Sequence, residues 1–208
     1  PELMYSMPKG LTAATGMDAL THAIESYITP GAWVMSDMFE LKAIEMIAQN
    51  LKAAVDNGKD VAAREAMSQA QYIAGMGFSN VGLGIVHSMA HPLGAFYDTP
   101  HGVANALLLP YVMEYNAESP AAPKYIHIAK AMGVDTTGMS EAEGVKAAIE
   151  AVKALSVSIN IPQKLHEINV KEEDIPALAV AAFNDVCTGG NPRPTSVADI
   201  EALYRKAF

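Results

Sequence analysis

Apolar residues recur along this chain every three or four positions, the spacing of one face of an α-helix. Between Ser36 and Val55, for example, one stripe contains Phe39, Ala43, Ile47, Leu51 and Val55. Turn-forming residues such as Asn57-Gly58-Lys59 separate the periodic segments. We predict helical segments over residues 11–28, 36–55, 61–75, 80–97, 103–115, 123–132, 141–159, 172–187 and 196–207.

Strands are not expected, because no segment combines apolar/polar alternation with β-branched enrichment. The segment 80–97 is apolar on all sides, which predicts a buried, central helix. Ser140 and Glu143 have the spacing of a capping box at the start of the following helix. These features predict an all-α domain over residues 1–208, a bundle of about eight helices.

Composition narrows the class of protein. Of the 208 residues, 50% are hydrophobic and 18% charged, so burial of apolar surface can offset the entropy of ordering and intrinsic disorder is excluded. A net charge of −9 without a Lys/Arg cluster argues against nucleic acid or an anionic membrane as partner. The single cysteine, Cys187, rules out an internal disulfide. With no signal-peptide pattern and no apolar run near the ~18 residues that span a bilayer, we expect a cytoplasmic location.

Two of the predicted helices each carry a pair of polar side chains at i, i+4 spacing, which places both on one face. Asp18 and His22 form one pair and His87 and His91 the other, while His101 follows beyond a turn. Facing helices of a bundle can arrange such groups around one ion. Imidazole and carboxylate together suit a divalent metal such as Fe, Zn, Ni or Mn.

Each histidine also has a simpler interpretation. An Asp-x-x-x-His pair is often a surface pair, and a histidine on an apolar helix is often a core residue bonded to a carbonyl. The combination favours a metal site, because several buried imidazoles without a common partner are costly. His127 and His166 lie in ordinary amphipathic or polar segments, and we expect both to be solvated. The chain has no glycine-rich phosphate loop, serine nucleophile elbow or Cys-x-x-Cys pair.

At this level of detail the sequence resembles the iron-dependent alcohol dehydrogenases. The motifs that carry the resemblance are Gly16-Met17-Asp18-Ala19-Leu20-Thr21-His22-Ala23-Ile24-Glu25, Gly84-Ile85-Val86-His87-Ser88-Met89-Ala90-His91-Pro92-Leu93-Gly94 and Pro100-His101-Gly102. The resemblance continues through residues 75–84 and 187–193 and covers essentially the whole chain. The resemblance implies the all-helical, metal-binding carboxy-terminal domain of a dehydroquinate-synthase-like fold. In that family an amino-terminal α/β half binds NAD, and its Gly-Gly-Gly-Ser stretch has no counterpart here.

The resemblance also implies roles for particular residues. The metal ligands would be Asp18, His22, His87 and His101, holding Fe²⁺, with Zn²⁺ as a substitute. His91 would be the catalytic histidine beside the nicotinamide of NAD(H) and the substrate. The substrate pocket would include Phe78, Leu83 and Cys187. The implied reaction interconverts a small alcohol and an aldehyde, such as a diol and a hydroxyaldehyde. We expect the isolated chain to be inactive without the NAD-binding half, and the whole enzyme to be a homodimer.

Two other functions remain open from the histidine pattern alone. One is a metal-assisted hydrolase or lyase that activates water at the same ion. The other is a non-catalytic helical domain whose histidines bind a structural ion. A structural site is closed by four protein ligands, whereas a catalytic site keeps an open position.

Overall fold

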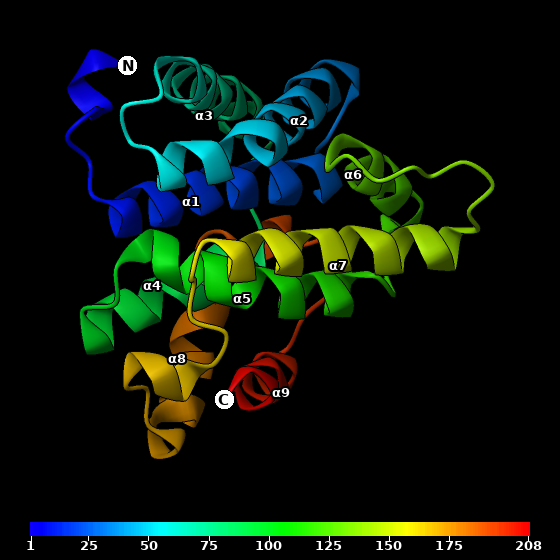
Figure 1. Ribbon diagram of the computed structural model, residues 1–208. Coiled ribbons are helices and arrows are strands. Elements are labelled where there is room, and N and C mark those ends of the chain that lie inside the picture. The colour runs from blue at the N-terminus through cyan, green and yellow to red at the C-terminus, as the bar shows by residue number, and fades with distance from the viewer.

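The chain folds entirely into helices joined by short loops, and the computed structural model describes all residues, 1–208 (Figure 1). Short 3₁₀ turns precede α1 and connect several of the later helices. The α-helices are α1 (Lys9–Ile28), α2 (Val34–Asp56), α3 (Val61–Val81), α4 (Ile85–Tyr97), α5 (His101–Asn116), α6 (Tyr125–Ala131), α7 (Glu141–Ser158), α8 (Ile175–Phe183) and α9 (Val197–Ala207). The predicted all-α class is confirmed.

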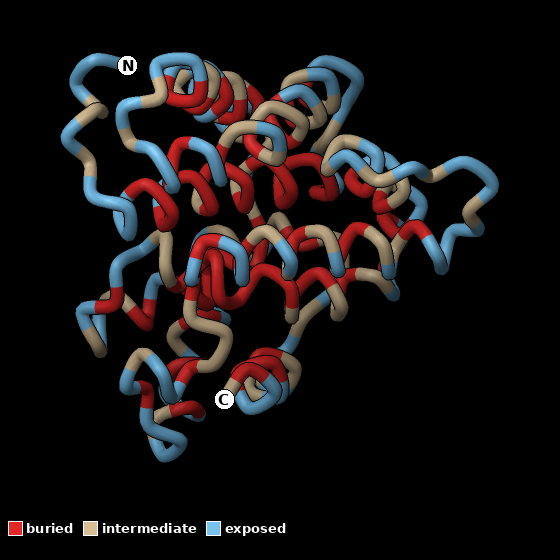
Figure 2. The backbone as a smooth tube through the Cα atoms, viewed as in Figure 1, coloured by how far each residue is buried: buried red, intermediate tan, exposed pale blue.

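Helix α1 lies at the centre of the molecule. It packs against α2 and α3 on one side and against α5 on the other, and α5 in turn contacts α4, α7 and α9. Figure 2 shows the buried residues gathered where these helices face one another, with the exposed residues on the outer faces and loops. Gly102 allows the close approach of α5 to α1, because a Cβ at this position would overlap the backbone carbonyl of Ala14. None of the helices combines the length and apolar character needed to cross a lipid bilayer.

The structure corrects one predicted helix in a way that matters for the site. The segment 80–97 is not a single helix, because α3 continues to Val81 and α4 begins only at Ile85. Gly82 ends α3 with a φ of 85°, a left-handed conformation that side chains disfavour. The first two turns of α4 are buried as predicted, but Phe96 near its end is exposed. The uninterrupted apolar pattern concealed this break.

Other helix ends differ by a few residues. Ser36 lies in the first turn of α2, where its hydroxyl accepts a hydrogen bond from the backbone N–H of Trp33 at 2.9 Å. The predicted helix 172–187 is shortened to α8, and a turn over residues 184–187 follows it. The capping box of Ser140 and Glu143 at the start of α7 is confirmed.

A buried guanidinium joins the start of α3 to the segment before α1. Arg64 is 1% exposed, and its donors reach the carbonyl oxygens of Gly58 at 2.9 Å and Met7 at 3.3 Å and the hydroxyl of Thr12 at 2.8 Å. All three partners are neutral, so Arg64 acts here as a multiple hydrogen-bond donor that fixes three separate segments.

We expect Arg64→Met to lower the free energy of unfolding by about 1–3 kcal/mol, because three acceptors lose their donor. Urea denaturation measures this change. Arg205→Met is the matched control, since Arg205 pairs with Glu201 on the exposed side of α9 and its loss should cost about 0.5 kcal/mol or less. Equal effects of the two substitutions would contradict the anchoring role of Arg64.

A second buried polar group, the carboxyl of Glu40, lies between α1, α2 and α3. Its Oε1 atom is 2.6 Å from the Ser26 hydroxyl, and a side chain at Gly77 would overlap it. The Ser26 hydroxyl is also 2.5 Å from the carbonyl oxygen of His22, and its single proton can serve only one of these two oxygens. A protonated Glu40 removes the conflict, since it can itself donate to Ser26. Burial raises the pKa of Glu40 to about 8, in spite of the hydrogen bond with Ser26.

We expect the stability of the protein to depend on pH through Glu40. In the unfolded chain this carboxyl loses its proton near pH 4.5, whereas in the folded chain it keeps the proton up to about pH 8. The free energy of unfolding therefore decreases as the pH rises from about 4.5 to about 8, and outside this interval it does not change with pH through this group. Glu40→Gln removes the effect, so the stability of the variant relative to the parent should rise with pH across this interval in urea titrations. A pH-independent difference would show that folding does not raise the pKa of Glu40.

Candidate metal centre

Helices α1 and α4 bring three candidate ligands together. The ligand atoms of Asp18, His22 and His87 all lie within 4.8 Å of one another. Asp18 Oδ2 is 3.9 Å from His22 Nδ1, and Asp18 Oδ1 is 3.8 Å from His87 Nε2. The rings of His22 and His87 stack with their centroids 4.5 Å apart. The two i, i+4 pairs therefore do converge, but with His87 facing the carboxylate and His91 one turn further along α4.

His101 borders this cluster from the first turn of α5. Its Nε2 atom lies 3.4 Å from Asp18 Oδ1, and its side chain is 44% exposed. Asn105, one turn later, donates from its amide to Asp18 Oδ1 at 2.6 Å and lies 3.0 Å from His101 Nε2. Asn105 thus orients both the carboxylate and the imidazole. The group of three with mutual distances under 4.8 Å does not include His101.

His87 supplies the strongest sign that a cation belongs here. Its Nε2 atom is buried without a hydrogen-bond partner, and its Nδ1 atom lies 2.5 Å from Glu25 Oε2. The carboxylate of Glu25 can only accept a hydrogen bond, so Nδ1–H is the donor. In the neutral ring Nε2 therefore carries a lone pair, 3.8 Å from Asp18 Oδ1. A buried lone pair without a donor is unfavourable, and a metal ion would satisfy it. Imidazole nitrogens around one carboxylate are a donor set that fits Fe²⁺ or Zn²⁺.

Burial also sets the protonation of these histidines. It lowers the pKa of His22 to about 4, although the nearby Asp18 carboxylate acts in the opposite direction. Burial likewise lowers the pKa of His101. For His87, burial is outweighed by the hydrogen bond and charge of Glu25, and the pKa is raised, so an ion bound at Nε2 would displace a proton. His22 and His101 are therefore neutral at physiological pH, the form in which imidazole binds metals.

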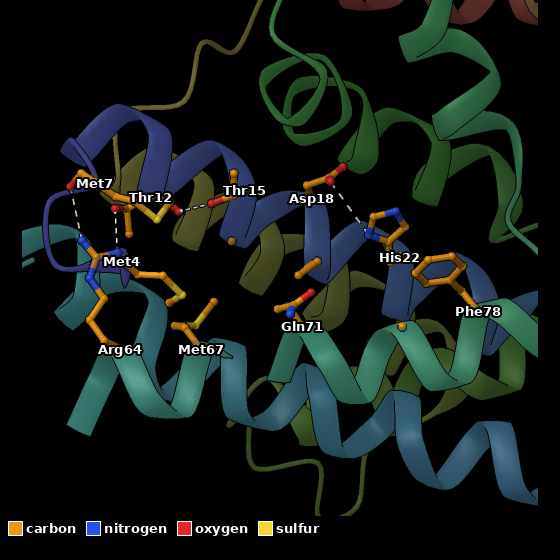
Figure 3. A pocket seen from close by; sticks show the side chains of 13 residues that line it. Met4, Met7, Thr12, Thr15, Asp18, His22, Arg64, Met67, Gln71 and Phe78 are labelled. Atoms are coloured by element: carbon orange, nitrogen blue, oxygen red, sulfur yellow. Dashed lines mark hydrogen bonds and ion pairs between the residues drawn. The ribbon is translucent and has the colours of Figure 1, made fainter. Parts of the chain in front are cut away.

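Phe78 is the one predicted pocket residue that contacts the cluster directly. Its ring stacks on His22 at 4.5 Å, and both line a cavity of about 420 Å³ between α1 and α3. Figure 3 shows this cavity with Asp18, His22 and Phe78 at one end and Arg64 at the other. The cavity therefore begins at the candidate metal centre.

Leu83 and Cys187 lie in two loops that contact each other rather than along this cavity. The carbonyl of Leu83 touches Gly190, where any side chain would collide with it. Cys187 follows α8, and its backbone N–H donates to Asp185 Oδ1 at 2.9 Å. Burial and the charge of Asp185 raise the pKa of the Cys187 thiol to about 12, so it stays protonated and is a poor nucleophile.

His91 is exposed beside the cluster. Its ring stacks on that of His101 with centroids 5.4 Å apart, and its Nδ1 atom lies 2.7 Å from Asp185 Oδ2. Of the remaining histidines, His127 and His166 are exposed as predicted. His127 Nδ1 lies 2.8 Å from the Tyr27 hydroxyl, and His166 Nδ1 donates to the carbonyl of Phe208, so neither histidine bonds to a candidate ligand.

Three residues that orient the candidate ligands and His91 were not predicted from the sequence: Glu25, Asn105 and Asp185. Glu25 follows His22 by three positions and Asn105 follows His101 by four, so helical spacing alone places each pair on one face. Asp185 carries no such signal, because its partner His91 is 94 positions away. Only the packing of α8 against α4 brings these two together.

We expect Glu25→Gln to weaken Fe²⁺ or Zn²⁺ binding by about 10–100-fold. Glu25 Oε1 already accepts from the backbone N–H of Val86 at 2.7 Å, so the amide oxygen will take that place and the amide nitrogen will face His87. The amide then donates to Nδ1, the imidazole proton moves to Nε2, and the ligand lone pair is lost. Competition with a chromophoric chelator measures the affinity. Glu40→Gln, a buried carboxyl that does not touch His87, is the control and should bind normally. Equal affinities for Glu25→Gln and the parent would contradict this role.

Comparison with known proteins gives the family of the chain. Residues 12–208 match the Fe-containing alcohol dehydrogenase family, C-terminal. Lactaldehyde reductase of Escherichia coli (strain K12) is 58% identical over 207 residues, a match that covers 100% of this chain and 53% of that protein. The 1,3-propanediol dehydrogenase of Klebsiella pneumoniae is 48% identical over 208 residues, covering 100% of this chain and 54% of that protein.

Solved structures of alcohol dehydrogenases have the same fold as this chain. A 1,3-propanediol oxidoreductase superposes with a TM-score of 0.98 at 48% identity, covering 100% of this chain and 54% of the other. An alcohol dehydrogenase from Oenococcus oeni gives a TM-score of 0.96 at 41% identity, covering 99% of this chain and 54% of the other. The chain thus spans about half the length of the relatives it matches. It belongs to the iron-containing alcohol dehydrogenase family and corresponds to the carboxy-terminal part of its members.

Proposed function

We propose that this chain is the metal-binding half of an NAD-dependent oxidoreductase that interconverts a small aldehyde and its alcohol. The observation that carries the proposal is the buried, unpartnered Nε2 atom of His87, which faces Asp18 beside the exposed His91. The names of the relatives, a lactaldehyde reductase and a 1,3-propanediol dehydrogenase, support small hydroxylated substrates. Within that class we propose lactaldehyde and 1,2-propanediol as the substrate pair.

Asp18, His22, His87 and His101 would hold the ion. When bound, Fe²⁺ supplies Lewis acidity to the substrate oxygen, and NAD(H) supplies or accepts the hydride. Zn²⁺ competes for such a nitrogen and oxygen donor set and binds it more tightly than Fe²⁺, so the ion found will depend on availability. NAD would be bound mainly by an amino-terminal half of the kind that completes the relatives.

His91 is the residue of this chain suited to proton exchange with the substrate. Its imidazole is exposed next to His101, and its Nδ1 atom is engaged by Asp185, which leaves Nε2 free. In alcohol oxidation Nε2 would accept the hydroxyl proton, and in aldehyde reduction it would return one to the oxygen. Its position beside the cluster also suits contact with the nicotinamide.

Phe78, Leu83 and Cys187 would shape the space around the carbon chain of the substrate. Phe78 stacks on His22 and so provides an apolar wall at the ion. Leu83 adds an aliphatic side chain, and Cys187 a small protonated thiol. Such apolar walls favour a short carbon skeleton and leave recognition of the oxygen to the ion and His91.

Exposure of the candidate ligands favours a catalytic over a structural ion. Asp18 and His22 keep about a fifth of their side-chain surface accessible, and the side chain of His101 is more exposed than either. A structural ion is normally enclosed by four buried ligands. A hydrolase or lyase would use the same open position, but the matched relatives named above are reductases and dehydrogenases.

We expect the chain alone to show no NAD turnover, and its fusion to the amino-terminal half of Escherichia coli lactaldehyde reductase, loaded with Fe²⁺, to reduce lactaldehyde with NADH. Hydride transfer requires the cofactor to be fixed against the substrate, which the isolated chain cannot achieve. NADH absorbance measures the rate. An iron-loaded, folded fusion without activity would contradict the proposed function.

In the same fusion we expect His91→Ala to lower kcat by roughly 10²–10⁴-fold, the usual contribution of a general acid–base group, with the iron content unchanged. His127→Ala is the control, because His127 is exposed and bonds to Tyr27, which is not a candidate ligand. Loss of iron from His91→Ala would make His91 a ligand and overturn its assignment as the proton-exchanging residue.

A further inference from the structure

The turn after α8 places a carboxylate against His91. Asp185 Oδ2 lies 2.7 Å from His91 Nδ1, while Asp185 Oδ1 accepts the backbone N–H of Cys187 at 2.9 Å. The two oxygens of one carboxylate therefore have separate partners. His91 Nε2 has no hydrogen-bond partner within the chain, and the side chain is 42% exposed.

Several contacts hold Asp185 in this orientation. Its Oδ1 atom is 3.5 Å from the hydroxyl of Ser88 on α4. The hydroxyl of Thr188 lies 2.8 Å from that of Ser88 and 2.8 Å from the carbonyl of Ala182 at the end of α8. The carboxylate is thus fixed from the turn that carries it and from α4. Burial opposes its ionisation, but the N–H of Cys187 and the imidazole of His91 together lower the pKa of Asp185. It is therefore negatively charged at neutral pH.

We propose that Asp185 is a positioning residue that holds neutral His91 as the Nδ1–H tautomer and so leaves Nε2 as the proton acceptor. The inference rests on the proposed function for its use in catalysis, but the tautomer itself can be measured without any reaction. When the alcohol is oxidised, its hydroxyl proton passes to Nε2, and the hydride leaves the carbon for NAD⁺. The imidazolium that forms lies against the charge of Asp185, which stabilises it.

The site then contains two carboxylate–imidazole pairs with different tasks. Glu25 accepts a hydrogen bond from Nδ1–H of His87 and turns its Nε2 toward Asp18. Asp185 accepts a hydrogen bond from Nδ1–H of His91, one turn further along α4, and leaves its Nε2 accessible. One pair prepares a ligand for an ion, and the other prepares an acid–base group, since a carboxylate partner fixes the tautomer of an imidazole.

A purely structural role for Asp185 is the competing explanation, because its contacts also tie the turn to α4. The tautomer distinguishes the two. In Asp185→Asn the amide oxygen must stay with the Cys187 N–H, so the amide nitrogen faces His91 Nδ1 and donates to it. The proton of His91 then moves to Nε2, which can no longer accept one. If Asp185 only holds the turn against α4, the substitution should not move the proton of His91 from Nδ1 to Nε2.

The test is a long-range ¹H–¹⁵N correlation spectrum of the 208-residue chain with ¹⁵N-labelled histidine, above about pH 8, where an ordinary imidazole is neutral. The His91 signals are assigned by their loss in His91→Gln. We expect the parent chain to show Nδ1 protonated and Nε2 unprotonated, and Asp185→Asn to show the reverse. The spectrum of the parent is decisive without a variant, because an Nε2–H tautomer there would overturn the proposal.

Asp174→Asn is the matched control. Asp174 accepts a hydrogen bond from Tyr97 at the end of α4, so it ties neighbouring segments without touching His91. We expect it to leave the His91 tautomer unchanged, and a reversal in this variant as well would show that loosened packing, not Asp185, controls the ring.

In the fusion described above, Asp185→Asn should lower kcat roughly 10²-fold or more without loss of iron. An inverted tautomer with normal kcat would overturn the positioning role. An unmutated, iron-loaded fusion without activity would overturn the proposed function and leave the tautomer result intact.

Discussion

The hydrogen bonds from the first turn of α4 to Glu25 are the interaction on which the rest of the site depends. Glu25 accepts one from the backbone of Val86 and one from the ring of His87, and it is almost fully buried. These bonds join α1 to α4, and in the neutral ring of His87 they place the proton on Nδ1 and the lone pair on Nε2. The same contact therefore joins two helices and would orient His87 as a ligand of the proposed ion. The other ring nitrogen of His87, Nε2, is buried and has no hydrogen-bond partner within the chain, so a bound ion would be its partner.

Close packing around α1 makes this arrangement feasible. A polar cluster in an all-helical core needs helices that approach closely, since each side chain reaches only a few ångströms. Gly102 lets the start of α5 lie on the backbone of α1, and this places His101 and Asn105 beside Asp18. The break at Gly82 lets α4 begin beside Glu25 instead of continuing the direction of α3. Both glycines thus set the positions of the helices around the candidate metal centre, Gly102 by close packing and Gly82 by its backbone conformation.

Much of this could be predicted from the sequence, for identifiable reasons. Helical periodicity gave the all-α class, and i, i+4 spacing brought Asp18 near His22 and placed His87 and His91 on one face of α4. The capping box at Ser140 is a local pattern and was found where expected. The break near Gly82 was not predicted, because an apolar run looks continuous whether or not one of its glycines takes a positive φ. Asp185 could not be found either, since its meeting with His91 depends on how α8 packs on α4, which no local pattern encodes.

The central claim is that Asp18, His22, His87 and His101 form one metal site within this chain. The most direct measurement is elemental analysis of the chain after anaerobic reconstitution with Fe²⁺ and removal of excess ion. It should be made beside Asp18→Ala and His101→Ala, with circular dichroism to confirm that the helices are retained. We expect about one iron per chain in the parent and loss of iron in both variants. Stoichiometric iron in Asp18→Ala, or none in the folded parent, would contradict it.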